Sequence, residues 1–84
     1  MLLTDDEIKA IIEPAFKPFA CVVESRPNRT MRFRVIKGRT QTPIYIEPGI
    51  PIDVLREESD LRELLHSVRR LLQKRGYRLI PLEK

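Results

Sequence analysis

The amino-acid sequence predicts a small α+β domain, in which two helices pack on one face of a three-stranded antiparallel sheet. Three observations support this fold class. A capped helical segment opens the chain, two runs of alternating apolar residues flank a turn, and a long leucine-rich segment of helical period lies near the end. The predicted order is α-β-β-β-α, and Tyr77–Leu82 is a candidate for one further strand. With 84 residues, the chain is expected to form one domain over residues 1–84.

The first helix is predicted between Thr4 and Glu13. Thr4 and Glu7 have the spacing of a capping box, in which each side chain accepts a hydrogen bond from the other residue's backbone N–H. Pro14 disfavours helical geometry at the residue before it, so the helix should end there. The apolar stripe expected to face the core consists of Ile8, Ile11 and Ile12.

A β-hairpin is predicted next, because apolar residues alternate on both sides of the turn residues 27–29. Side chains that are directly opposite in neighbouring strands stabilise a sheet when they are both apolar or oppositely charged. The register that satisfies this rule pairs Cys21 with Val35, Val23 with Phe33, and Glu24 with Arg32.

A third strand is predicted at Thr42–Glu47, with Ile44 and Ile46 facing the core. Pro43 cannot donate a backbone hydrogen bond, which places this strand at an edge of the sheet. Residues 48–51 contain two prolines and a glycine, so we expect a rigid connection there.

The second helix is expected to begin near Ser59 or Asp60, with Glu63 completing an Asp-x-x-Glu box, and to end at Gly76. Its apolar residues cover an arc of roughly 120°, the width of a core-facing helix. They are Leu61, Leu64, Leu65, Val68, Leu71 and Leu72.

Charge is distributed unevenly along this chain of net charge +4. Residues 26–39 carry six basic side chains and no acid, and residues 67–80 carry five more, whereas the first helix is acidic. These clusters of basic residues permit nucleic acid as a partner without requiring it.

The hairpin carries one candidate contact surface for nucleic acid or another anionic partner. Arg32 and Arg34 should project from the face opposite the core, and Tyr45 is the candidate aromatic side chain beside them. The alternative is a solvated face, on which Glu24 and Glu47 flank Arg32 as cross-strand partners.

The polar face of the second helix carries the other candidate surface. The basic residues there favour a phosphate- or carboxylate-binding face, and the alternative is a solvated face whose last cations complement the helix dipole. The candidate contact residues are Arg62, Arg69, Arg70, Lys74 and Arg75. Because the helix should cover the Met31 and Phe33 side of the sheet, these residues and the hairpin arginines should lie on opposite sides of the molecule.

No catalytic or metal-binding constellation is evident. Cys21 alternates inward and is expected in the core, and His66 is the only histidine, with no companion ligand. We therefore expect no enzyme activity, no cofactor and no metal. The longest apolar run, around residues 50–52, is far short of a bilayer span, and the N-terminus has no secretory signal pattern. With a single cysteine, the chain is expected to be cytoplasmic.

The segment Ile11–Cys21 has the pattern I-I-E-x-x-F-x-P-x-x-C before a hairpin, and a leucine- and arginine-rich helix follows Gly49–Ile50. In both features the chain resembles a family of short, uncharacterised pseudomonad proteins, a domain of unknown function. The resemblance implies an intracellular bacterial protein and assigns no catalytic residue. The arginine-rich hairpin and the segment from Tyr77 onward are not part of it.

These observations favour a non-enzymatic regulatory or adaptor domain that binds another protein or a second copy of itself. The alternative is a nucleic-acid-binding module that uses the arginine-rich hairpin and helix face.

Overall fold

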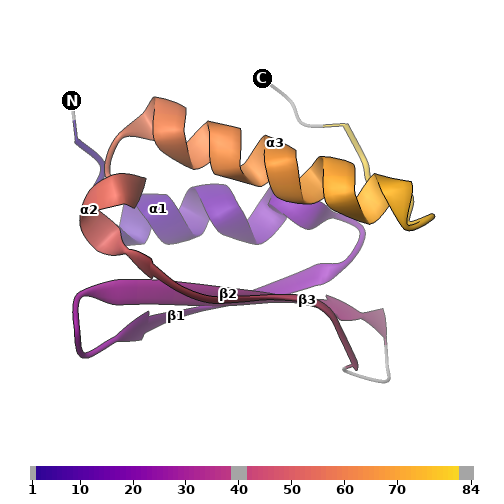
Figure 1. The fold of residues 1–84 in the computed structure, drawn as a ribbon, viewed down its shortest axis with the longest axis horizontal. Coiled ribbons are helices and arrows are strands. Elements are labelled where there is room, and N and C mark those ends of the chain that lie inside the picture. Colours follow the sequence, from indigo (N-terminus) through magenta and orange to yellow (C-terminus); the bar gives the residue numbers. More distant parts are fainter. Residues whose placement is uncertain (1, 39–41, 82–84) are drawn as a thin grey trace.

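The computed structural model describes residues 2–38 and 42–81, and its elements follow the predicted order (Figure 1). They are α1 (Asp5–Ile12), the 3-10 helix η1 (Glu13–Phe16), β1 (Ala20–Arg26), β2 (Thr30–Lys37), β3 (Thr42–Pro51), the short α2 (Ile52–Leu55) and α3 (Glu58–Lys74). The prediction of a final strand is wrong for residues 77–81, which form no strand; Leu82 lies outside the described residues.

Helix α1 begins as predicted. The Glu7 N–H donates to Thr4 Oγ1 at 3.2 Å and the Thr4 N–H donates to Glu7 Oε1 at 2.8 Å, which completes the capping box. Ile8 and Ile12 are fully buried. The helix is followed directly by η1, which contains Pro14 in its first turn. Because η1 continues the helical path, it brings Ala15 and Phe16 into the core as well.

The β1–β2 hairpin has the predicted register, with Cys21 opposite Val35, Val23 opposite Phe33 and Glu24 opposite Arg32. At the turn, Arg29 has a φ of 56°, in the left-handed region that closes a tight hairpin. The hairpin therefore places alternate β2 side chains on a buried face and on an open face.

Strand β3 departs from the prediction. It is an edge strand, as Pro43 indicated, but it continues through the supposed rigid connection to Pro51. The register with β2 shifts between Val35 and Ile36, where β3 has an extra residue. An extra residue changes the alternation of side chains between the two faces. Tyr45 is consequently opposite Val35 on the core side, and the prediction that Ile46 faces the core is wrong, since Ile46 lies opposite Arg34 and is 54% exposed.

Helix α3 packs its predicted apolar arc against the sheet, although Leu71 at the margin is 36% exposed. It begins at Glu58 with Glu57 as N-cap, so Asp60 falls within its first turn and forms no capping box with Glu63. The helix ends before Gly76, whose φ of 96° suits the left-handed position that follows a helix.

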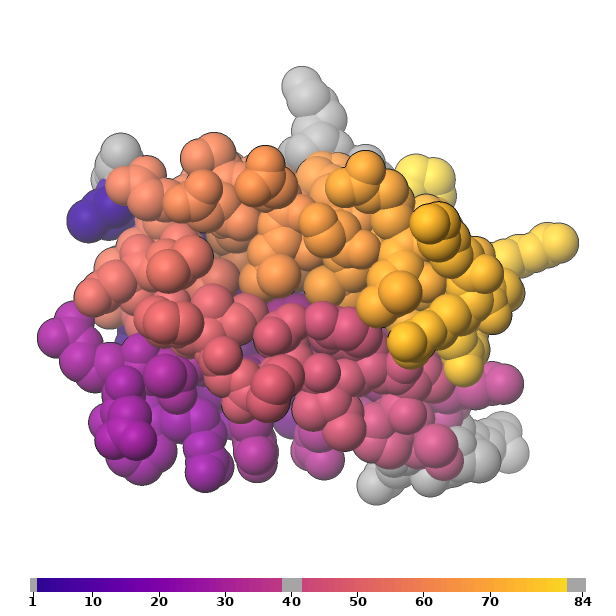
Figure 2. Space-filling model, viewed as in Figure 1, coloured from indigo at the N-terminus to yellow at the C-terminus, as the bar shows by residue number. Residues whose placement is uncertain are grey.

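Both long helices lie on the same side of the sheet, as predicted (Figure 1). They cover the face that carries Met31, Phe33 and Val35, all of which are buried. The Phe16 and Phe33 rings stack with centroids 5.7 Å apart, joining the end of the first helical segment to the central strand. No helix of the described chain covers the other face, and strand side chains project from it below the molecule in Figure 2.

The segment 77–81 runs back from α3 toward η1. Tyr77 packs edge-on against Phe19 with ring centroids 5.6 Å apart, and the Ile80 N–H donates to the Lys17 carbonyl at 2.8 Å. These contacts hold the segment beside α3, where it forms one wall of a hollow described below.

Candidate functional site

The open face of the sheet is the first candidate surface. Its central row places Arg34 of β2 between Val22 of β1 and Ile46 of β3. The next row places Ile36 between Ala20 and Pro43. Ile46 is 54% exposed, while Val22 and Ile36 are half-buried. These two rows are therefore apolar apart from the Arg34 guanidinium, whereas the row on the other side of Arg34 pairs Glu24 with Arg32.

Arg34 makes no direct ion pair in the described part of the chain. Its Nε is buried and has no hydrogen-bond partner there. A buried donor without a partner destabilises the protein by roughly 1–3 kcal/mol. The Arg34 guanidinium is thus a charged donor that an external acceptor would satisfy.

Arg32 behaves differently from Arg34, because it has the predicted partner across the hairpin. Its Nε donates to Glu24 Oε1 at 2.6 Å. This hydrogen bond, followed by the positive charges of Arg32, Arg34 and Arg26, lowers the pKa of Glu24. The prediction that Glu47 also flanks Arg32 is wrong. Glu47 lies opposite Phe33 and accepts a hydrogen bond from the Tyr45 hydroxyl.

A pH titration should detect the Glu24–Arg32 pair. Because the pKa of Glu24 is lowered in the folded state, its stabilising contribution is present above the unfolded pKa of about 4.3 and is lost as pH falls through the folded value. Arg32→Gln should raise the pKa of Glu24, measured by NMR of its side-chain carboxyl. The stability difference between the two proteins should shrink below about pH 4. An identical pKa in both proteins would show that the pair is absent in solution.

The aromatic side chain predicted beside these arginines is on the other face. Tyr45 lies 6.0 Å from Phe33 between ring centroids, and its hydroxyl donates to Glu47 at 2.6 Å. Burial, followed by the neighbouring Glu47, raises the pKa of Tyr45 to about 12. The other aromatic residues also belong to the core or pack against it. The open face consequently has no aromatic side chain among the described residues.

On α3, the prediction that Arg69 lies on the polar face, opposite the apolar arc, is wrong. Arg69 is only 7% exposed. It donates through Nη1 to the Ala15 carbonyl at 2.6 Å and through Nη2 to the Ile80 carbonyl at 2.8 Å. Burial lowers the pKa of Arg69, but a guanidinium remains protonated in proteins. Its place in the sequence, four residues after Leu65 and three before Leu72, borders the apolar arc and is the signal that could have revealed its burial.

The remaining basic residues of α3 stay at the surface. Arg62 pairs with Glu58 at 2.7 Å, one helical turn away. Arg70, Lys74 and Arg75 are exposed and form no ion pair within the described chain. They lie on the helix side of the molecule, so the structure separates them from Arg32 and Arg34, as the strand alternation predicted.

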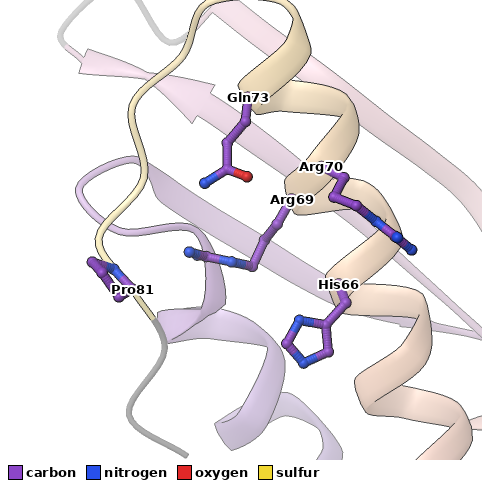
Figure 3. Close-up of a pocket in the computed structure, with 5 residues that line it drawn as sticks. All are labelled: His66, Arg69, Arg70, Gln73 and Pro81. Carbon is purple, nitrogen blue, oxygen red and sulfur yellow. The ribbon is translucent and has the colours of Figure 1, made fainter.

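A hollow of about 480 Å³ opens between α3 and segment 77–81 (Figure 3). Its lining comprises His66, Arg69, Arg70, Gln73 and Pro81. In Figure 3, Arg69 and Gln73 point toward the segment that carries Pro81, whereas the Arg70 guanidinium points away from it. The sequence predicts Arg69 and Arg70 as contact residues on a phosphate- or carboxylate-binding face, but it does not predict this hollow, because it makes Tyr77–Leu82 a candidate strand.

Other reactive groups are few in the described chain. Burial, followed by the charge of Glu13, raises the pKa of the Cys21 thiol to about 12, so the reactive thiolate is scarce at neutral pH. Within residues 2–38 and 42–81, His, Cys, Asp and Glu form no group of three that could hold a metal ion. No helix in these ranges is both long and apolar enough to cross a membrane.

Comparison with known proteins confirms the resemblance seen in the sequence. Neither the curated proteins nor the solved structures include a match to this chain. A family model described as a protein of unknown function, DUF1652, matches residues 6–72. The match includes the arginine-rich hairpin, which the sequence pattern had not connected to the family, and ends before segment 77–81. The chain therefore belongs to the DUF1652 family of proteins of unknown function.

Proposed function

We propose that this protein is a non-enzymatic binding domain whose open sheet face docks onto an apolar, carboxylate-bearing surface of another protein. The observation that carries the proposal is Arg34, which lies between Val22 and Ile46 and whose buried Nε has no hydrogen-bond partner among residues 2–38 and 42–81. A carboxylate in the partner would satisfy this donor while apolar residues of the partner covered Ile46.

Arginine surrounded by apolar side chains is typical of the residues that dominate binding energy at protein interfaces. The guanidinium can hold a carboxylate through two parallel hydrogen bonds, and the excluded water strengthens both. The rows that carry Val22, Ile46 and Ile36 supply apolar area on an open sheet face, which suits a protein surface better than a small molecule.

The charge on this face favours a different protein over a second copy of the chain. Among the described residues, Arg26, Arg32 and Arg34 are accompanied there by one acid, Glu24, which already pairs with Arg32. Two copies facing each other would bring like charges together, which opposes association. An acidic partner has the complementary sign.

Nucleic acid is the less favoured partner for the open face. Binding of single strands combines positive charge with aromatic side chains on which bases stack. Tyr45, the candidate for that role, packs against Phe33 on the opposite face. The exposed Arg70, Lys74 and Arg75 would be the contacts of a nucleic acid, and they lie on the helix side.

The proposal is tested by site-specific photo-crosslinking in cells of the source organism. A photoreactive phenylalanine derivative replaces Ile46 on the open face or, as control, Val54 on α2; these side chains are 54% and 47% exposed. We expect a defined protein adduct from position 46 and none from position 54. In the Ile46-labelled chain, Arg34→Glu should reduce the adduct about tenfold or more, because charge reversal at a buried pair costs about 2–5 kcal/mol. Arg70→Glu should leave it unchanged.

Two results would contradict the proposal. One is equal crosslinking from positions 46 and 54, or an adduct that Arg34→Glu does not weaken. The other is tight binding of labelled DNA or RNA that Arg70→Glu abolishes and Arg34→Glu does not, which would assign function to the helix side instead.

A further inference from the structure

The hollow between α3 and segment 77–81 has the chemistry of an anion site. Arg69, Gln73 and His66 supply hydrogen-bonding groups along one helix, and none of the lining residues in the described part of the chain is acidic. Gln73 and His66 are exposed, so their polar groups are accessible from the hollow. The Arg69 guanidinium is buried and pairs with no carboxylate in the described chain.

Arg69 has donors beyond those that tie the chain together. A guanidinium has five N–H groups, of which the hydrogen bonds to the Ala15 and Ile80 carbonyls use two. Those carbonyls hold the guanidinium in a fixed orientation without neutralising its charge. A preorganised cation in a partly closed hollow binds an anion with little loss of side-chain freedom.

A second hollow, of about 520 Å³, shares the lining residue Gln73 with the first. Its lining is different in character, since Tyr77 and Leu79 contribute ring and aliphatic surface beside Gly76 and Arg78. Both Tyr77 and Leu79 pack partly against the core, which holds this wall in place.

We propose that the two hollows form one binding site for a small phosphorylated molecule. The phosphate group lies in the first hollow and accepts hydrogen bonds from Arg69, Gln73 and His66. Phosphate presents more oxygen acceptors and more negative charge than a carboxylate, which suits several donors with no acid among them. The organic part lies in the second hollow against Tyr77 and Leu79. The combined space is within the range of small-molecule sites.

The site lies on the helix side of the molecule, away from the open sheet face, so it does not depend on the proposed protein-binding function. Binding of a phosphorylated molecule would leave Arg34 and Ile46 untouched. The two proposals can therefore succeed or fail separately.

The test is an NMR titration of the ¹⁵N-labelled protein with phenyl phosphate and with inorganic phosphate, each at constant ionic strength set with chloride. We expect saturable shifts of the Gln73 side-chain amide and of backbone amides in 66–81. Phenyl phosphate should bind several-fold more tightly than inorganic phosphate, because only phenyl phosphate occupies the second hollow. Non-saturating shifts, or shifts centred elsewhere, would overturn the site; equal affinities would overturn the role of the second hollow.

A pair of charge-matched variants tests the location. Gln73→Glu places a carboxylate inside the hollow, and Ser59→Glu adds the same charge in the first turn of the same helix, roughly 20 Å away along its axis. Both positions are exposed, so both variants should fold. Gln73→Glu should weaken binding of phenyl phosphate at least tenfold, while Ser59→Glu should change it less than twofold, since that distance exceeds the screening length of about 10 Å. Equal weakening by both would show non-specific attraction and overturn the proposal.

Discussion

Phe33→Ala should lower the free energy of unfolding by about 4 kcal/mol, a large share of the roughly 5–15 kcal/mol that stabilises a small domain. Phe33 lies at the centre of β2 and is 1% exposed. Its ring stacks on Phe16 at 5.7 Å and contacts Tyr45 at 6.0 Å, so its removal opens a cavity between sheet and helices. Urea unfolding followed by circular dichroism measures the loss.

Ile46→Ala is the matched control for this prediction, because it also removes apolar atoms from the sheet but on the open face. With Ile46 54% exposed, we expect a change within about 0.5 kcal/mol. The difference between the stability losses of Phe33→Ala and Ile46→Ala shows which face of the sheet the helices cover. Similar losses for Phe33→Ala and Ile46→Ala would mean that the open face is covered in solution, for example by a second copy of the chain.

Arg69→Met should lower the free energy of unfolding by about 3 kcal/mol, because hydrogen bonds from charged groups contribute about 1.5–3 kcal/mol and two are lost. Methionine retains much of the aliphatic stem, so the loss reports the guanidinium. The carbonyls of Ala15 and Ile80 would lose their donors, and η1, α3 and segment 77–81 would lose the contact that joins them. Thermal and urea unfolding provide the measurement.

The neighbouring Arg70→Met is the control, since it deletes the same group from an exposed position without an ion pair in the described chain. Its effect should stay within about 0.5 kcal/mol. Hydrogen exchange gives a second readout: the Ile80 N–H, which donates to the Lys17 carbonyl, should exchange faster in Arg69→Met than in Arg70→Met. Equal stability and equal exchange in the two variants would show that Arg69 does not hold this segment.

Because Arg69 anchors the fold and Arg70 does not, variants of the two residues test different properties of the protein. Loss of binding in an Arg69 variant would combine destabilisation with loss of a contact. Gln73 and Ser59, which are exposed on the same helix, separate the two effects. The same reasoning favours Arg34 and Ile46 as probes of the open face, because neither anchors an element of the fold.

Much of the architecture was predictable from local patterns. The Thr4–Glu7 box places the start of α1, and the alternation on both sides of the turn sets the β1–β2 register, including the Glu24–Arg32 pair. The helical period of the leucines identifies the buried face of α3. Each of these features depends on residues a few positions apart or on one short turn, so the sequence itself carries the information.

The features closest to function were decided by tertiary structure. The extra residue in β3 moves Tyr45 to the core face and Ile46 to the open face, and nothing in the strand's own composition marks its position. Arg69 donates hydrogen bonds to the Ala15 and Ile80 carbonyls, which lie 54 and 11 residues away in the chain. Its burial therefore depends on contacts that no local sequence pattern shows. Local sequence determined α1, the β1–β2 hairpin and α3, because propensity and periodicity are short-range, but it did not determine the end of β3 or the path of residues 77–81. Only the packed chain determined which polar groups lack partners, since satisfying a buried donor depends on segments that meet after folding.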